Sequence, residues 1–192
     1  APHDPPPVMS GRNPGVLRLP VGISSCLLGQ AVRHDGGHKR APRIEAFLSP
    51  HIAWIPVCPE VEIGLGIPRA PIRLEGRPGS PRLVAIASRK DLSGTMTAFA
   101  GVRIGKLLEA GLCGYIFKKN SPSCGVAGVP VYAEQEITGS APGLFAGLLA
   151  ARCRNLPMVE EDSLDSEAAC NDFLARVRAY RDSGAGDRKR GS

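Results

Sequence analysis

No apolar run in the sequence approaches the roughly 18 residues that a membrane-spanning helix needs. The N-terminus also lacks the charged, apolar and small-residue regions of a signal peptide. These absences predict a cytoplasmic protein with no membrane partner. The chain has no internal repeat, and 192 residues with 43% hydrophobic content suit one compact domain.

The six cysteines include no CxxC pair. This absence counts against a thiol redox protein, which needs two cysteines that can form a disulfide. The spacing of structural zinc motifs is missing for the same reason. Because cytosolic thiols are kept reduced, we expect these cysteines to be metal-bound or buried rather than disulfide-paired.

The two ends of the chain differ in composition from its middle. Residues 1–14 (APHDPPPVMSGRNP) are rich in proline and poor in large apolar groups, and residues 183–192 form a basic tail. Both are predicted to be disordered, which leaves one domain at 15–182. The formal net charge of +6 favours anionic partners such as nucleotides or RNA, although part of it lies in the basic tail.

Between the tails, strand and helix patterns alternate. Short apolar runs predict strands at 16–25, 52–57, 115–117, 129–132 and 156–159. Helical patterns separate the strands, at 43–48, 95–110, 144–153 and 166–180. This alternation predicts an α/β fold with a mainly parallel sheet and helices on both faces. Residues 72–93 are rich in turn residues and predict a small hairpin or an excursion over the site.

Three cysteines follow predicted strands: Cys26, Cys58 and Cys124. Open parallel sheets bind their ligands at the carboxyl ends of their strands, so we expect these thiols at one edge. Serine, proline and glycine beside each cysteine favour tight turns that leave N–H groups free for thiolate or cluster sulfur. The other three, Cys113, Cys153 and Cys170, are predicted to be small buried hydrophobes.

The spacing of the three thiols does not decide which metal they would bind. Zinc in a structural site needs a fourth ligand, for which His34 and His38 are the candidates. A [4Fe-4S] cluster on three cysteines would instead leave one iron open as a Lewis acid.

Three separated stretches, SSCLLGQAVRHDGGHK, VCPEVEIGLGIPRAPIRL and KKNSPSCG, together resemble the signature of the thiouracil desulfidase family, often called TudS-like proteins. The similarity runs from about Val21 through GLFAGLLAARCRNLPMVEE. It implies a Rossmann-like three-layer domain and a [4Fe-4S] cluster on Cys26, Cys58 and Cys124, with one iron not bound by protein. It also implies a hydrolytic desulfidase that removes sulfur from thiouracil or 4-thiouridine monophosphate without net redox chemistry, giving the uracil compound and hydrogen sulfide.

Two departures from the family pattern keep alternatives open. His34 stands where relatives often have an aromatic residue after the arginine. Some relatives with the GLGxPRxPxRL variant continue into a second domain and act on thiolated tRNA, so 4-thiouridine in tRNA is an alternative substrate. A non-catalytic, metal-binding regulator is an alternative function.

The implied hydrolysis needs a general base near the cluster. Glu60, two residues after a ligand, is the first candidate and Asp35 the second. Glu60 has an alternative role as an ion-pair partner of Arg33 or Arg69. Asp35 has one as the start of an Asx turn with the two glycines that follow it.

The remaining candidates lie in the same motif loops. Ser121 and Ser123 flank Cys124 and are expected to bond substrate oxygen or cluster sulfide, or else to stabilise the turn around Pro122. The positive side chains expected to bind a substrate phosphate are Arg33, Lys118 and Lys119.

Overall fold

The computed structural model describes residues 17–184. The predicted tail at 1–14 lies outside this range, as does the tail at 183–192 except for its first two residues. Within the described range, no helix is both long enough and apolar enough to cross a bilayer. The strands form two four-stranded sheets.

The first sheet carries the site and is entirely parallel, in the order β2-β1-β5-β8. Every residue of β5, with the sequence GYIF, is buried, as expected for a strand covered on both faces. Because the strands are parallel, their carboxyl ends meet at one edge. The four strands are β1 (Leu19–Ser24), β2 (Ile52–Val57), β5 (Gly114–Phe117) and β8 (Met158–Glu160).

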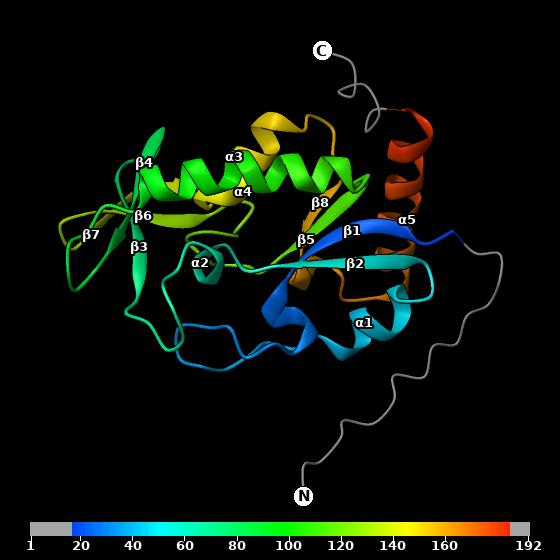
Figure 1. Ribbon diagram of the computed structural model, residues 1–192, viewed down its shortest axis with the longest axis horizontal. Helices are drawn as coiled ribbons and strands as arrows, with labels where there is room; N and C mark the ends of the chain where they lie inside the picture. The colour runs from blue at the N-terminus through cyan, green and yellow to red at the C-terminus, as the bar shows by residue number, and fades with distance from the viewer. Residues whose placement is uncertain (1–16, 185–192) are drawn as a thin grey trace, which may run out of the picture.

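Helices cover both faces of this sheet. Helix α3 packs with α4 on one face, and α1 packs with α5 on the other (Figure 1). Crossovers between parallel strands are right-handed. The chain crosses from β1 to β2 on one side and then from β2 back past β1 to β5, in the opposite direction along the sheet. The two crossover helices, α1 and α3, therefore lie on opposite faces. This confirms the predicted three-layer α/β fold. The helices are α1 (Pro42–Leu48), α3 (Ser93–Glu109), α4 (Leu144–Arg152) and α5 (Glu167–Asp182).

The centre of the sheet depends on a glycine in β1. A Cβ atom on Gly22 would lie 2.3 Å from the ring of Tyr115 in β5. The Tyr115 ring also stacks on Phe117, with 3.9 Å between the ring centroids. A larger residue at position 22 would therefore displace the aromatic layer beneath α3 and α4.

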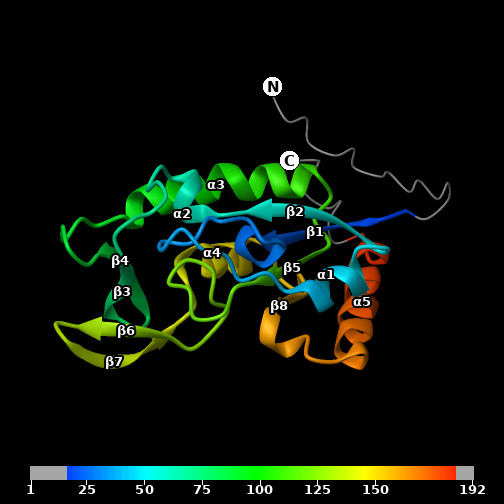
Figure 2. The ribbon, with the colours of Figure 1, turned by 90° about the horizontal axis from the view of Figure 1, so that it is seen from below.

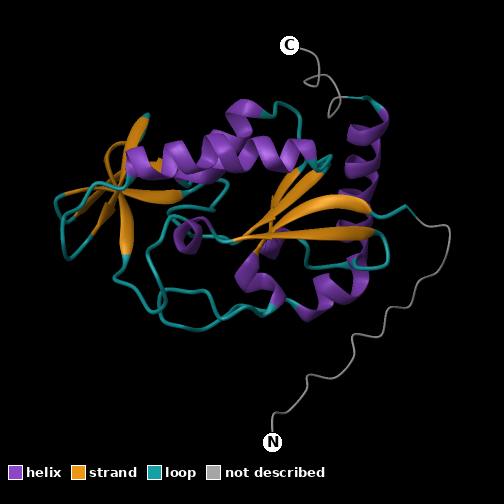
Figure 3. Cartoon of the chain, viewed as in Figure 1, coloured by secondary structure: helices purple, strands orange, loops and turns teal. Residues whose placement is uncertain are grey.

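The second sheet has the order β4-β3-β6-β7. Its outer pairs are antiparallel hairpins, and β3 and β6 join them in parallel. It lies beyond the carboxyl edge of the first sheet (Figures 2 and 3). Its strands are β3 (Ile72–Arg77), β4 (Ser80–Ala85), β6 (Val129–Ala133) and β7 (Glu136–Ala141).

This second sheet corrects two sequence-based expectations. The hairpin predicted within 72–93 is present as β3 and β4, but it is half of a sheet rather than an isolated excursion. The strand predicted at 129–132 belongs to this sheet and not to the parallel one. The buried carboxylate of Glu75 accepts hydrogen bonds of 2.7 Å from Arg73 and from Arg89, so its charge is paired inside the sheet.

Other differences are local. The first predicted strand, 16–25, is shorter than expected, since β1 begins at Leu19 and Ser25 already belongs to a 3-10 turn, η1 (Ser25–Leu28). Position 16 lies outside the described residues. Strand β8 begins two residues later than predicted. The one-turn helix α2 (Pro59–Glu62), with proline at its first position, was not predicted. A second short 3-10 turn, η2 (Glu161–Ser163), follows β8.

Candidate metal centre

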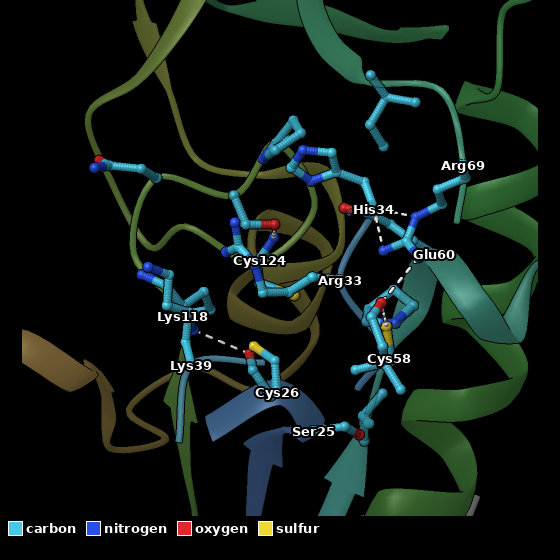
Figure 4. Close-up of a pocket in the computed structure, with 18 of the residues that line it drawn as sticks. Ser25, Cys26, Arg33, His34, Lys39, Cys58, Glu60, Arg69, Lys118 and Cys124 are labelled. Carbon is cyan, nitrogen blue, oxygen red and sulfur yellow. Dashed lines mark hydrogen bonds and ion pairs between the residues drawn. The ribbon is translucent and has the colours of Figure 1, made fainter. Parts of the chain in front are cut away.

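Cys26, Cys58 and Cys124 line one cavity of about 350 Å³ at the carboxyl edge of the parallel sheet (Figure 4). Cys26 lies in η1 after β1, and Cys58 is the N-cap of α2 after β2. Cys124 lies in the loop after β5. The structure thus brings the three predicted ligands together, although 98 positions separate the first from the last.

The other three cysteines belong to the hydrophobic core and do not line this cavity: Cys113, Cys153 and Cys170. None of the six forms a disulfide. Cys26 and Cys124 are also buried in the core, so the position at the cavity is what distinguishes the predicted ligands from the other three cysteines.

The surroundings of the site thiols disfavour their ionised forms in the protein alone. Burial, assisted by neighbouring Cys58, raises the pKa of Cys26 to about 11. Burial also raises the pKa of Cys58 and, together with the charge of Glu60, that of Cys124. Lys118 and Arg33 act in the opposite direction on the pKa of Cys26. A metal group that binds here must therefore displace thiol protons, so its affinity depends on pH.

Backbone contacts fix the position of Cys58. Its N–H donates to Glu62 Oε1 at 3.1 Å, and its Sγ lies 3.8 Å from the Val32 carbonyl oxygen. Arg103 from α3 pairs with the same Glu62 at 3.0 Å. The loop after β1, the start of α2 and the helix α3 are therefore tied together at this ligand.

The loop around Cys124 is closed by Ser121. The Ser121 Oγ accepts hydrogen bonds from the backbone N–H groups of Ser123 and Cys124, at 3.2 and 3.0 Å. The loop then packs on the start of α4, because Leu144 and Phe145 donate their N–H groups to the Pro122 and Ser123 carbonyls. These contacts replace the partners that the first N–H groups of a helix lack within the helix itself.

Gly143 makes this close packing possible. It is the N-cap of α4, and its N–H donates to the Gly125 carbonyl at 2.7 Å. A Cβ on Gly143 would lie 2.6 Å from the Ser123 carbonyl carbon and 2.7 Å from the Cys124 nitrogen. Sequence reasoning missed this residue. Its position directly before a predicted helix was the available signal.

Glu60 is fixed by two side chains. Its Oε1 accepts a hydrogen bond of 3.0 Å from the Ser123 hydroxyl, which is fully buried. Its Oε2 accepts from Arg69 Nε at 2.8 Å, and a second Arg69 nitrogen lies 2.7 Å away. Of the two ion-pair partners considered for Glu60, Arg69 forms the pair, whereas Arg33 pairs with Asp35.

The Arg69 side chain is 6% exposed and connects several loops. It donates to the carbonyl oxygens of Val32 and Gly66, at 2.8 and 3.1 Å, while it pairs with Glu60. Figure 4 shows Glu60 and Arg69 on the Cys58 side of the cavity. Sequence reasoning named Arg69 as an ion-pair partner of Glu60 and as one of several cations beside the motif loops, but it did not predict that Arg69 connects these loops.

Asp35 lies apart from this group. Its side chain is 51% exposed, accepts the Gly37 N–H at 2.9 Å, and is not among the residues that line the cavity. Its hydrogen bonds with the Arg33 side chain and the Gly37 N–H lower its pKa to about 2. This is the Asx-type turn that was the alternative role for Asp35.

The predicted phosphate-binding side chains all line the cavity, and each pairs with a carboxylate. Arg33 lies 3.2 Å from Asp35, Lys118 pairs with Glu161, and Lys119 pairs with Asp162. Their positive charge is therefore largely balanced in the protein alone.

The donor groups at the cavity bear on which kind of metal group it could hold. Within residues 17–184, no group of three or more His, Cys, Asp or Glu side chains could hold a metal ion. Of the two candidate fourth zinc ligands, His34 lines the cavity, whereas His38 does not line it and its Nδ1 accepts the Arg40 N–H at 3.2 Å. Three separate thiols around one cavity suit a cluster with several irons.

Comparisons with known proteins agree with this geometry. The family model described as 2-thiouracil desulfurase matches residues 21–161. The uncharacterized protein YbbK of Bacillus subtilis (strain 168) is 31% identical over an alignment of 134 residues, and the match covers 66% of this chain and 87% of that protein. A solved structure of the [4Fe-4S]-dependent thiouracil desulfidase TudS matches with a TM-score of 0.63 and 28% identity. The match covers 81% of this chain and 99% of that one.

Proposed function

Because the chain belongs to the 2-thiouracil desulfurase family, we propose that it is a [4Fe-4S]-dependent desulfidase of thiolated pyrimidines. The overall reaction replaces the ring C=S by C=O, consumes one water and releases hydrogen sulfide, with no net change in oxidation state. The similarity to TudS supports the cluster as the cofactor.

One observation carries the proposal: three thiols from three separate loops surround one cavity, with Glu60 fixed beside them. Cys26, Cys58 and Cys124 would hold the cluster. When bound, it would supply an iron without a protein ligand, a Lewis acid suited to the sulfur of the substrate.

Glu60 is the proposed general base. It would accept a proton from the water that attacks the ring carbon bearing the sulfur. Arg69 binds Oε2 and orients the carboxylate, while Ser123 contacts the other oxygen. We prefer Glu60 to Asp35 because Glu60 lines the cavity and Asp35 occupies an exposed turn.

The serines beside Cys124 have supporting roles in this proposal. Ser121 keeps the loop in shape through the N–H groups of Ser123 and Cys124. Ser123 orients Glu60 through its hydroxyl. Both act through other groups, so neither needs to touch the substrate.

A mononucleotide, 4-thiouridine monophosphate, is the proposed preferred substrate, with thiouracil as the smaller alternative and 4-thiouridine in tRNA as the larger one. Five lysine and arginine side chains line the cavity and four of them pair with a carboxylate, so one positive charge is left over, which supports an anionic substrate. A phosphate also forms charge-assisted hydrogen bonds that a free base lacks.

The test is an anaerobic assay of the reconstituted protein with thiouracil, 4-thiouridine monophosphate and thiolated tRNA side by side. We expect brown protein with broad visible absorbance and release of sulfide from the mononucleotide. A colourless protein, or an iron-loaded protein that releases sulfide from none of the three, would contradict the proposal.

A further inference from the structure

The cationic side chains at the cavity are not equivalent. Five of them line it: Arg33, Lys39, Arg69, Lys118 and Lys119. Four of these pair with a carboxylate, namely Asp35, Glu60, Glu161 or Asp162. One positive charge at the cavity is therefore not paired with a carboxylate, and this charge belongs to Lys39.

Lys39 is available to a ligand. Its side chain is exposed, and no carboxylate of residues 17–184 pairs with it. Its backbone N–H donates to the Cys26 carbonyl at 2.9 Å, which fixes the residue next to the first cysteine. Figure 4 shows Lys39 on the Cys26 side of the cavity, away from Glu60 and Arg69. An incoming anion can reach this ammonium group without breaking an ion pair.

The four paired cations interact with other groups of the protein. Lys118 and Arg33 lower the pKa of the Cys26 thiol, so their charge acts on the thiols. Arg69 orients Glu60. Lys119 is anchored to η2 by its pair with Asp162 and by the bond from its N–H to Glu161, at 2.7 Å.

We propose that Lys39 directly binds the phosphate monoester of the nucleotide substrate and so determines the preference for a nucleotide over the free base. This inference rests on the proposed function. The ammonium group offers three donors to phosphate oxygens, and a charge-assisted contact of this kind selects against ligands that lack the phosphate.

The test measures binding separately from turnover. Dissociation constants of uridine monophosphate and of uridine are determined under anaerobic conditions for the wild type, Lys39→Gln, Lys39→Arg and Lys106→Gln. Lys106 is an exposed lysine of α3 outside the cavity, so its variant controls for the loss of one charge. We expect Lys39→Gln to weaken uridine monophosphate binding roughly tenfold or more, the scale of one charge-assisted hydrogen bond. Uridine binding and iron content should stay as in the wild type, and Lys39→Arg should retain most of the affinity.

Three outcomes would overturn the assignment. They are unchanged uridine monophosphate binding in Lys39→Gln, no preference of the wild type for uridine monophosphate over uridine, and loss of iron in Lys39→Gln. The last would mean that Lys39 balances the thiolates instead. Turnover of free thiouracil, which has no phosphate, tests the proposed function independently.

Discussion

At the residue scale, Glu60 differs from the carboxylates that pair with the other cavity cations, because Glu60 lines the cavity and buried groups contact both of its oxygens. Asp35, Glu161 and Asp162 pair instead with side chains that are partly or largely exposed. A carboxylate that is fixed in this way can accept a proton in a defined direction. In the proposed mechanism, such a carboxylate would serve as a base that does not depend on solvent.

Replacing Glu60 by Gln tests this role. Glutamine keeps the shape of the side chain and an oxygen that can accept from Arg69, so iron content and substrate binding should persist. Turnover should fall roughly a hundredfold or more, the usual scale for one general base. The measurement is kcat under anaerobic conditions, alongside iron analysis. Normal turnover would move the role to Asp35 or to solvent.

The cysteines give a second prediction at this scale. Alanine at Cys26, Cys58 or Cys124 should abolish cluster retention, because two thiolates cannot hold a four-iron cluster. Alanine at one of the core cysteines should retain iron and lower the free energy of unfolding by about 1 to 3 kcal/mol. Iron analysis and thermal melts of all six variants check this. Full iron in any of the first three would remove that residue from the ligand set.

Much of the residue-scale picture was accessible from the sequence. A cysteine after each of three strands predicted where the thiols lie, since parallel strands share a carboxyl edge. Gly143 was not identified as part of the site, and Arg69 was not predicted to join its loops. Arg69 reaches Val32, 37 positions earlier in the chain, and Gly143 contacts a loop that precedes it by about 20 positions. Contacts over such separations depend on tertiary packing, which local patterns do not encode.

At the scale of elements, the start of α4 and the Cys124 loop form one packed unit. Gly143→Ala would push a methyl group against the backbone at Ser123 and Cys124. We expect it to reduce iron retention and to destabilise the protein by about 1 to 3 kcal/mol, the usual cost of overpacking.

Gly147→Ala on the same helix is the matched control. The nearest atom to a Cβ there is 3.6 Å away, on Pro142, which is an ordinary contact. This variant should keep its iron and gain about 0.5 to 1 kcal/mol, because alanine is the better helix former. Melting curves and iron analysis compare the stability and the iron retention of the two variants. Equal behaviour of both would show that the loop tolerates displacement.

The parallel sheet and its helices were predictable because their strand and helix patterns alternate along the chain. The second sheet was not. Its central pairing joins Leu74 to Val131, and nothing local in either hairpin indicates a parallel partner so far away. Strand β7 was missed because its sequence, EITGSA, has little apolar alternation.

At the scale of the whole molecule, the charges at the cavity bear on how substrate affinity depends on salt. A mononucleotide offers one phosphate, whereas tRNA offers many, and affinity falls with salt in proportion to the phosphates contacted. Since most cations at the cavity are already paired, we predict a shallow salt dependence for 4-thiouridine monophosphate and weak tRNA binding. KM for base and monophosphate at two salt concentrations, with tRNA binding under the same conditions, checks this. A steep salt slope with tight tRNA binding would identify RNA as the substrate.

The contact between α4 and the Cys124 loop has a consequence for hydrogen–deuterium exchange. The first amides of a helix usually exchange fast because they have no partner within the helix. Here the amides of Gly143, Leu144 and Phe145 donate to the carbonyls of Gly125, Pro122 and Ser123. Slow exchange at these three positions should therefore report a closed cysteine loop, and faster exchange its opening, without any measurement on iron.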